Sequence, residues 1–574
     1  MAAAKDQQER IRHFVRRLSS LERQRSSWES HWREIAAVMQ PTKGRWLGDK
    51  ENDGGKRNQK VIDSTAIRSV KVLAAGMHGG LTSPSRPWFR LGLKNKDLEK
   101  QEDVKFWLQD TQQKIMDVFA SSNFYSTVHS HYLDLIPFGT GAFTIEEDWR
   151  DVIRCRCLTV GEYCIDVDGY GRVDSMYRRF KMTARQIFDR FPASTPERVR
   201  DMAERDTDAW LEILHAIEPR HEAERDFTRR DGRNKAFTSV YILLDGEKVI
   251  LEEDGYDEFP ACCPRWEVVG SDVYGRSPGM DVLPDVNMLQ RMRKDGLEAL
   301  ELEVKPPMNV SNDIKNVGGK FGMKPSFANF VNTNSPVPQI SPTYQIRSNL
   351  QALDVYLKDV RQQIREGFYN DLFMLISQTD KRMTATEVAE RNSEKLIMLG
   401  PVLERLKSEL YEPLITRVFA IMVRYGKILP PPEAIQGQEW ELEIISMLAL
   451  AQKSANIAAI EQLTAYVGGL AQVDPNVLDK LDTDDMVDQM AQLLGVPATI
   501  IRVENMVEQT RAARAEAQAQ QAQAETQAAM LAEGADIAQK LSNVRLDEQT
   551  AAAALFGAGG GGLTPGVPQG VPVQ

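Results

Sequence analysis

Three closely spaced aspartates are the residues whose type and spacing come nearest to a metal-binding pattern. Asp166, Asp168 and Asp174 could offer carboxylate ligands to a divalent cation such as calcium. Their spacing departs from the EF-hand loop, because neither the turn glycine nor the closing glutamate of that loop is in place. The surrounding apolar residues alternate as in two strands joined by a turn at Asp168-Gly169. We therefore favour a β-turn with solvated aspartates and keep a carboxylate metal site as the alternative.

Two histidines and two cysteines offer weaker chemical signals. His129 and His131 would share a face on a strand, but no HExxH context and no third ligand accompany them in the sequence. Cys155 and Cys157 lie beside basic residues that could lower a thiol pKa, yet their apolar strand pattern indicates buried side chains. The glycine- and proline-rich stretch 78–90 predicts a turn and then an extended strand. We interpret all of these residues as structural.

The familiar catalytic sequence patterns are absent. The chain contains no GxxxxGKS or GxxxxGKT phosphate-binding loop, no GxSxG nucleophile elbow and no HExxH zinc motif. The absence of all of them together argues against an enzyme, and no cofactor is expected.

Composition limits the partners. The 574 residues are 42% hydrophobic and 27% charged, as in a soluble globular protein with a large core, and carry a formal net charge of −11. Proteins that grip nucleic acid tightly are usually basic, whereas an acidic bore would repel phosphate and let DNA slide. Five cysteines without a CxxC pair, and no apolar run of signal-peptide length at the start, fit a reducing cytoplasmic setting. No apolar run reaches the length of about 18 residues that a membrane span needs.

Two long helices joined by a polar hairpin organise the middle of the chain. Apolar or small residues recur every three or four positions over 277–304 and again over 345–372, which predicts one helix in each range. The segment between them, 305–344, is polar and proline-rich, as expected of a hairpin. A polar loop over 373–383 leads to a third long helix over 384–432, which should kink at its internal prolines.

The remaining elements follow from the same patterns. Helices are expected over 12–39, 65–77 and 103–119, a helix, glycine turn and strand over 132–146, strands over 152–180, a helix capped by Thr183, a charged helical region over 198–231, a hairpin over 237–251, an acidic loop over 252–258, a strand over 259–269, a short strand over 440–445, a helical block over 448–495 and a long exposed helix or bundle member over 499–543.

Four short motifs, found in the right order, resemble the head-to-tail connecting (portal) proteins of short-tailed bacteriophages. They are Gly80-Leu-Thr-Ser-Pro-Ser-Arg-Pro-Trp-Phe89, Phe138-Gly-Thr-Gly141, Tyr274-Gly-Arg-Ser-Pro-Gly279 and Met383-Thr-Ala-Thr-Glu-Val388. Together with the helix, hairpin, helix, loop, helix order they cover the chain to about Pro432. No motif of this kind covers the part after Trp440.

The resemblance implies a mainly helical α+β portal fold that assembles as a ring, a dodecamer, at one vertex of the capsid. Its parts would be a mixed α/β wing over 1–276, stem helices over 277–304 and 345–372, a clip hairpin over 305–344, a tunnel loop over 373–383, a kinked helix returning to the wing over 384–432, a helical crown over 433–543 and a disordered tail over 544–574.

The resemblance also implies a function and a set of partners. Double-stranded DNA would pass through the ring into the head during packaging and out again at ejection. Because the chain has no nucleotide-binding loop, the energy would come from the terminase large subunit. Further partners would be a tail adaptor protein, the capsid protein and a scaffolding protein, with no membrane. The protein would be assembled in the bacterial host cytoplasm and reside in the virion.

Two basic sets would make the contacts. In the tunnel loop, Gln378, Thr379, Lys381 and Arg382 would touch DNA phosphates without reading sequence. The clip would contact neighbouring subunits or the adaptor through a net charge of +3, although a solvated basic loop stays open as the alternative. That charge comes from Lys305, Lys315, Lys320 and Lys324, opposed only by Asp313.

Two other classes of function remain open. One is an enzyme that processes nucleic acid, with Asp166, Asp168 and Asp174 as metal ligands. The other is a helical scaffolding protein, which rests on the Ala-, Gln- and Glu-rich segment 499–543.

Overall fold

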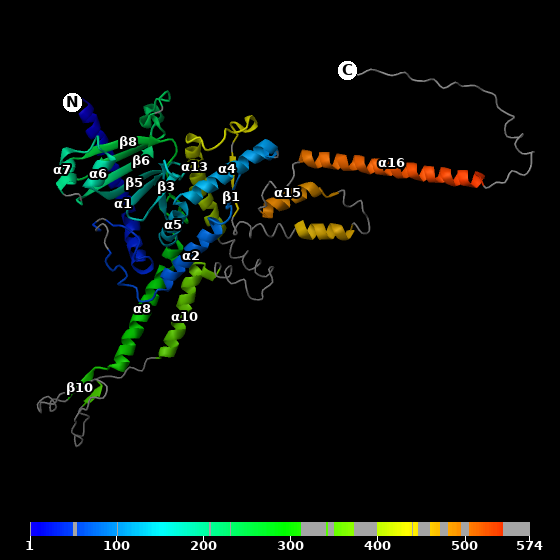
Figure 1. The fold of residues 1–574 in the computed structure, drawn as a ribbon. Helices are drawn as coiled ribbons and strands as arrows, with labels where there is room; N and C mark the ends of the chain where they lie inside the picture. Colours follow the sequence, from blue (N-terminus) through cyan, green and yellow to red (C-terminus); the bar gives the residue numbers. More distant parts are fainter. Residues whose placement is uncertain are drawn as a thin grey trace, which may run out of the picture. The chain divides into compact units, whose positions relative to one another are not determined.

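The computed structural model describes residues 2–46, 48–49, 54–99, 101–205, 208–229, 231–310, 340–342, 349–371, 399–438, 440–445, 460–470, 480–494 and 504–542. The chain divides into two units, Met1–Ala498 and Thr499–Gln574. The first unit mixes helices with antiparallel sheets, as Figure 1 shows, so the expected α+β class is confirmed in this coarse form.

A five-stranded antiparallel sheet, built from strands between Tyr163 and Tyr256, lies in the N-terminal half of the first unit. Its order is β4-β5-β6-β7-β8. Helix α1 covers one face, where Phe14 and Leu18 pack against Leu214 and Val240. Helices α6 and α7 cover the other face through a second apolar cluster. The bounds are α1 (Ala2–Met39), β4 (Tyr163–Val167), β5 (Val173–Thr183), α6 (Ala184–Arg190), α7 (Glu197–Arg205), β6 (Trp210–Pro219), β7 (Phe237–Leu243) and β8 (Val249–Tyr256).

The largest core lies among helices and a smaller sheet beside it. Strands β3-β2-β9 form a three-stranded sheet against which α5 packs, and α5 in turn contacts α2 and α8. Strand β1 pairs antiparallel with β12, so chain segments more than 300 residues apart join in one small sheet. The bounds are α2 (Thr65–Leu81), β1 (Phe89–Leu93), α3 (Lys96–Glu99), α4 (Glu102–Ser121), α5 (Phe124–Phe138), β2 (Ala142–Asp148), β3 (Val152–Leu158), β9 (Ala261–Cys262) and β12 (Trp440–Ile444).

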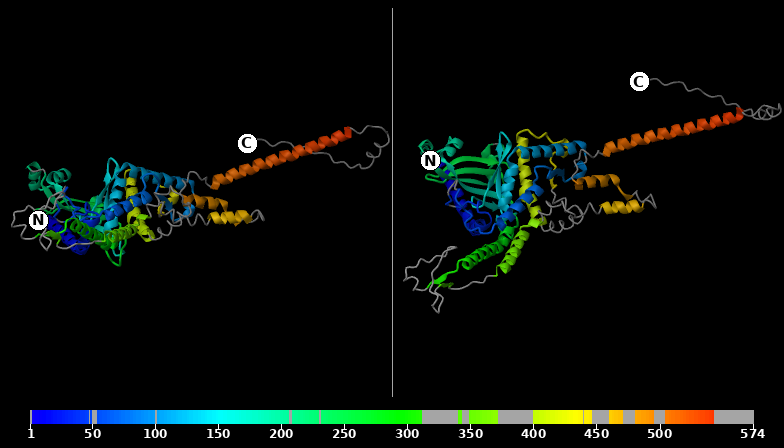
Figure 2. Two further views of the ribbon diagram at one scale, coloured as in Figure 1. Left: turned by 90° about the horizontal axis from the view of Figure 1, so that it is seen from below. Right: turned by 60° about the horizontal axis from the view of Figure 1, so that its bottom comes forward.

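Two long helices form what we call the arm. Helix α8 (Pro278–Val304) lies beside α10 (Leu350–Gly367), as both views of Figure 2 show. Strands β10 (Met308–Val310) and β11 (Ile340–Pro342) pair antiparallel just beyond the end of α8. The sequence therefore placed these helices, and the base of the hairpin between them, in the right ranges.

The third long helix is interrupted, as its prolines predict. Residues 399–406 are α-helical, Lys407–Tyr411 form the π-helix η3, and α13 (Glu412–Arg424) follows. Pro413 stands in the first turn of α13 and lacks the N–H that would bond the carbonyl four residues earlier, inside the π-turn. The helix ends before Gly426, which has a φ of +64°.

The C-terminal part is helical where the structure describes it. Residues 460–470 and α15 (Thr483–Leu494) belong to the first unit. In the second unit α16 (Glu504–Ser542) is one long helix, and nearly all of its described side chains are exposed. Among the described helices, none combines the length and apolar character that a bilayer crossing requires. Short 3₁₀ turns complete the description: η1 (Glu222–Glu224), η2 (Gly232–Asn234) and η4 (Glu433–Ile435).

Several expected elements were wrong. The charged region 198–231 contains a short helix and then β6, the central strand of the large sheet, because charged flanks conceal a run that is buried on both faces. The acidic loop over 252–258 is largely β8, and the strand over 259–269 shrinks to Ala261–Cys262. Gly79 and Gly80 lie in the last turns of α2, so the chain turn comes after them.

Candidate functional site: the arm and the junction at its base

Two of the sequence motifs meet at the start of the arm, in what we call the junction. Gly139 adopts a φ of +77°, and a Cβ at Gly139 or at Gly275 would overlap the carbonyl oxygen of the other residue. The contact is fixed by hydrogen bonds of 2.8 Å from Gly275 N to Thr140 Oγ1 and from Trp266 N to Gly139 O. Only glycine allows two backbones to lie this close. These glycines therefore serve packing between segments far apart in the sequence.

The same contact sets the first turn of α8. Ser277 caps the helix, because its Oγ accepts from Met280 N at 3.0 Å. The hydroxyl also donates to Pro137 O at 2.7 Å, and a Cβ at Gly279 would lie 2.6 Å from that oxygen. The C-terminal end of α5 thus packs directly against the first turn of α8 and fixes where that helix begins.

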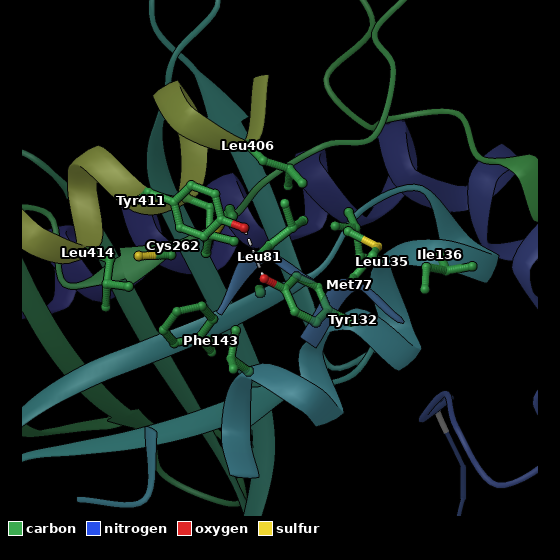
Figure 3. Close-up of a cluster of buried hydrophobic side chains, with 14 of the residues drawn as sticks. Met77, Leu81, Tyr132, Leu135, Ile136, Phe143, Cys262, Leu406, Tyr411 and Leu414 are labelled. Carbon is green, nitrogen blue, oxygen red and sulfur yellow. Dashed lines mark hydrogen bonds between the residues drawn. The ribbon is translucent and has the colours of Figure 1, made fainter. Parts of the chain in front are cut away.

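A third motif and the π-helix complete the junction. Tyr132 and Tyr411 share a hydrogen bond of 3.0 Å between their hydroxyl oxygens, drawn in Figure 3, and Thr82 Oγ1 lies 3.4 Å from the Tyr132 hydroxyl. Burial raises the pKa of Tyr132 to about 12, so both hydroxyls stay protonated in this apolar cluster. Trp88 packs beside them, with ring centroids 5.5 Å from Tyr411 and 5.8 Å from Phe119.

A buried ion pair joins the π-helix to the strand region. Arg265 is 3% exposed and contacts both carboxylate oxygens of Glu409, from Nη2 at 2.7 Å and from Nε at 3.1 Å. Its backbone N–H adds a bond to Glu409 at 2.9 Å, and Nη2 also donates to Gly171 O at 2.7 Å. Bidentate geometry with further bonds is what makes a buried pair tolerable. The sequence offered no signal for this pair.

A polar clasp holds both arm helices to the segment before α2. The Gln290 side-chain amide accepts from Ile62 N and Asp63 N and donates to Asp63 O, each at 2.8 Å. Arg361 of α10 donates to Asp63 Oδ2 from Nη2 at 2.7 Å and from Nε at 3.1 Å, and Thr65 bonds the other oxygen. Burial raises the pKa of the Asp63 carboxyl, but the bonds from Thr65 and Arg361 outweigh it and leave the pKa lowered.

The two arm helices pack closely at two glycines. A Cβ at Gly296 would lie 2.7 Å from Leu353 Cδ2, and one at Gly367 would overlap Val282 Cγ2. All the fully buried residues of α8 lie in its first half, up to Gln290. Beyond that point the outer half of the arm exposes large apolar side chains to solvent. They are Leu297 45%, Leu300 42%, Val304 68%, Val355 65% and Tyr356 64%.

Comparison with known proteins identifies the family. A sequence profile of the bacteriophage head to tail connecting protein family matches residues 12–501. The chain belongs to this family. A probable portal protein of Bordetella phage BPP-1 is 39% identical over 544 residues, covering 94% of this chain and 96% of that protein. The portal protein of Salmonella phage epsilon15 is 37% identical over 563 residues, covering 97% and 99%. The resemblance inferred from the four motifs is confirmed.

Solved structures add only a distant likeness to this connecting protein. A chain in the neck of an empty GTA particle, computed with C6 symmetry, has a TM-score of 0.33 and 13% identity, covering 74% of this chain and 89% of that one.

Most of the predicted contact residues of the connecting protein lie outside the described residues. Lys305 is described: it is exposed and caps the C-terminus of α8, its N–H donating to Glu301 O at 2.7 Å. The others are Lys315, Lys320, Lys324, Gln378, Thr379, Lys381 and Arg382, and the motif from Met383 to Val388 lies outside as well.

The three aspartates of the connecting protein have partners within the chain. Asp166 pairs with Arg17 of α1, and Asp174 accepts from Ser175 Oγ at 2.8 Å. Asp168 Oδ1 accepts from the backbone N–H groups of Tyr170 and Arg172 at 2.8 Å, which is a β-turn contact. Among the residues that the structure describes, no group of three His, Cys, Asp or Glu could hold a metal ion.

The histidines and cysteines are packing residues. His129 and His131 lie on α5 and not on a strand, so they do not share a face. Burial first, and Lys43 second, lower the pKa of His131 to about 3, and its ring packs on Phe143 with centroids 5.2 Å apart. Burial raises the pKa of Cys155 and of Cys157 to about 12, which is opposite to activation.

Proposed function

We propose that this member of the connecting protein family is a portal protein, a ring-shaped channel at one capsid vertex of a phage particle. Family membership over residues 12–501 and two relatives named as portal proteins, matched over nearly their full length, support this function. The role is structural: the ring passes double-stranded DNA inward at packaging and outward at ejection. The site of action is the virion.

The observation that best supports a ring is the set of exposed apolar side chains on the outer half of the arm. Five large apolar side chains on α8 and α10 are between 42% and 68% exposed there. Leu297, Leu300 and Val304 recur at helical spacing, so they line one strip of α8. A strip of this kind on an otherwise charged helix needs a partner, and in a closed ring the neighbouring copy supplies it.

In this proposal each segment of the chain corresponds to one part of a portal subunit. The arm forms the stem, the hairpin over 305–344 the clip, residues 373–383 the tunnel loop, and the sheets with their helices the wing over 1–276. Residues 433–543 form the helical crown, and β12 within that range pairs with β1 of the wing. Helix α16 is assigned to the crown by its place in the chain.

Contacts with DNA are weak and read no sequence. A net charge of −11 disfavours tight binding along the bore, while basic residues in each tunnel loop add up around the ring. We assign this contact to Gln378, Thr379, Lys381 and Arg382. Lys305, Lys315, Lys320 and Lys324 of the clip contact neighbouring subunits or the tail adaptor. The terminase large subunit docks on the ring during packaging. Capsid and scaffolding proteins contact the assembled dodecamer.

Electron microscopy of the purified chain, combined with light scattering, tests the proposal. We expect closed rings with a central hole and a mass of about twelve subunits. A monomer at every concentration would overturn it.

A further inference from the structure

A groove of about 690 Å³ lies along the outer edge of β5, past the end of β4. It is lined by β5 residues 178–182, by the 45–49 loop and by residues of α1 and α6. Arg179 donates its backbone N–H to Glu162 O at 3.1 Å, the last contact between the two strands. Alternate residues of an antiparallel strand present their backbone N–H and C=O groups to the same edge. Lys181 is two residues after Arg179, so its N–H and C=O also face this groove.

The groove has unpaired positive charge. Seven arginine or lysine and five aspartate or glutamate side chains line it, a net +2 in a chain of net −11. Each of the five carboxylates already has an arginine partner. In the described part of the chain, no carboxylate pairs with Arg45, Arg156 or Lys181. The groove therefore suits an acidic partner.

The opposite end of the same sheet is acidic. Strand β8 lies four strand spacings from β4, or about 19 Å away, and forms the other edge. Residues 245–256 carry five carboxylates and one lysine, Lys248, and Arg10 and Arg233 pair with one of these carboxylates, that of Glu253. Glu247, Glu252 and Asp254 are exposed, and no lysine or arginine forms an ion pair with Glu247 or Glu252 among the described residues. The carbonyl of Leu251 already accepts from Ser194, so contacts at this edge depend on side-chain charge more than on strand pairing.

We propose that the acidic edge of β8 in one copy docks into the basic β5 groove of the next copy, joining adjacent subunits head to tail. A heterologous interface needs two different complementary surfaces on opposite sides of one subunit, and the two ends of a sheet meet that need. The inference rests on the proposed ring, but it names surfaces distinct from the arm.

Charge reversal tests the contact. The variant Arg156→Glu/Lys181→Glu makes the β5 groove acidic like the β8 edge. The variant Glu247→Lys/Glu252→Lys makes the β8 edge basic like the groove. Each variant alone should need about tenfold more protein, or more, for half-assembly at low salt. The two mixed in equal amounts should form rings in which the variants alternate, detected by native mass spectrometry. The control Arg12→Glu/Arg16→Glu changes charge equally on exposed α1 positions outside the groove and should assemble like the wild type.

The outcomes separate this inference from the proposed function. Wild-type rings together with normal assembly of both variants alone would overturn the sheet contact and leave the portal function standing. Impaired variants that fail to rescue each other when mixed, while each keeps the wild-type unfolding midpoint, would also overturn it. A wild-type chain that never forms rings would overturn both.

Discussion

The junction and the outer arm use the same helix in opposite ways. At the junction, the first turns of α8 are buried, capped and locked against the end of α5 by glycine contacts. In the outer half, the same helix leaves Leu297, Leu300 and Val304 between 42% and 68% exposed. The junction is complete within one chain, whereas in the proposed ring the outer arm is covered by another copy. Substitutions at the junction should therefore act on the folding of the single chain, and substitutions on the outer arm on assembly.

The largest loss of stability should follow Gly139→Ala. The new Cβ would overlap the carbonyl oxygen of Gly275, and alanine disfavours the φ of +77°. We expect a loss of about 3 kcal/mol or more in the free energy of unfolding, measured by urea denaturation. The control is Gly169→Ala, which has ordinary φ and no atom within 4 Å of the added Cβ, and should change stability by less than about 0.5 kcal/mol. Equal effects at the two glycines would contradict the role of the junction.

The ion pair at the π-helix comes next. Arg265→Met removes the bidentate partner of Glu409 and leaves its largely buried carboxylate with Arg405, 3.0 Å away, so we expect a loss of about 2 kcal/mol. The double variant Arg265→Met/Glu409→Gln should recover part of that loss, because the largely buried carboxylate charge is removed and Arg405, which loses its partner 3.0 Å away, is about one-third exposed to solvent. A matched exposed pair, Arg185 with Asp189, should contribute about 0–1 kcal/mol in the same assay. If the double variant is no more stable than the single one, the pair is not the cause.

Periodicity and motifs predicted the arm, because both signals are local. Two apolar stripes placed α8 and α10, and the internal prolines predicted the break filled by η3. The four motifs identified the family, and two of them proved to be one contact between distant segments. The sequence could show that those glycines matter for the resemblance, but not that they touch each other.

Elements whose signals depend on tertiary contacts were missed. Strand β6 is buried on both faces and lies between charged segments, so it shows no alternation to separate it from a helix. The clasp of Asp63, Gln290 and Arg361 joins three segments by single polar residues, which have no periodicity or motif to find. The spacing of His129 and His131 could not show which element carries them, and on α5 the two side chains do not share a face.

The clasp should give a smaller, pH-dependent effect. Asp63→Asn removes the charge from the bonds to Arg361 and Thr65, and we expect a loss of about 1–2 kcal/mol at pH 7. Because the folded-state pKa of Asp63 lies below its ordinary value of 3.8, the stabilisation is complete above that value and is lost as the pH falls through the folded pKa. The difference in unfolding free energy between wild type and variant should therefore shrink from pH 7 to pH 3. A constant difference would show that ionisation of Asp63 plays no part.

The smallest effect on the single chain should come from the outer arm, and it completes the contrast with the junction. Leu297→Ser/Leu300→Ser replaces side chains that are 45% and 42% exposed, so the free energy of unfolding should fall by only about 1 kcal/mol per site. The same variant should lose ring assembly by light scattering, because serine cannot bury apolar surface against a neighbouring copy. The matched control on the same helix is Leu289→Ala, fully buried, which should cost about 2–5 kcal/mol. If the outer-arm variant still forms rings, the strip on α8 faces solvent in the assembly and the subunits join elsewhere, with the sheet ends as the remaining described candidate.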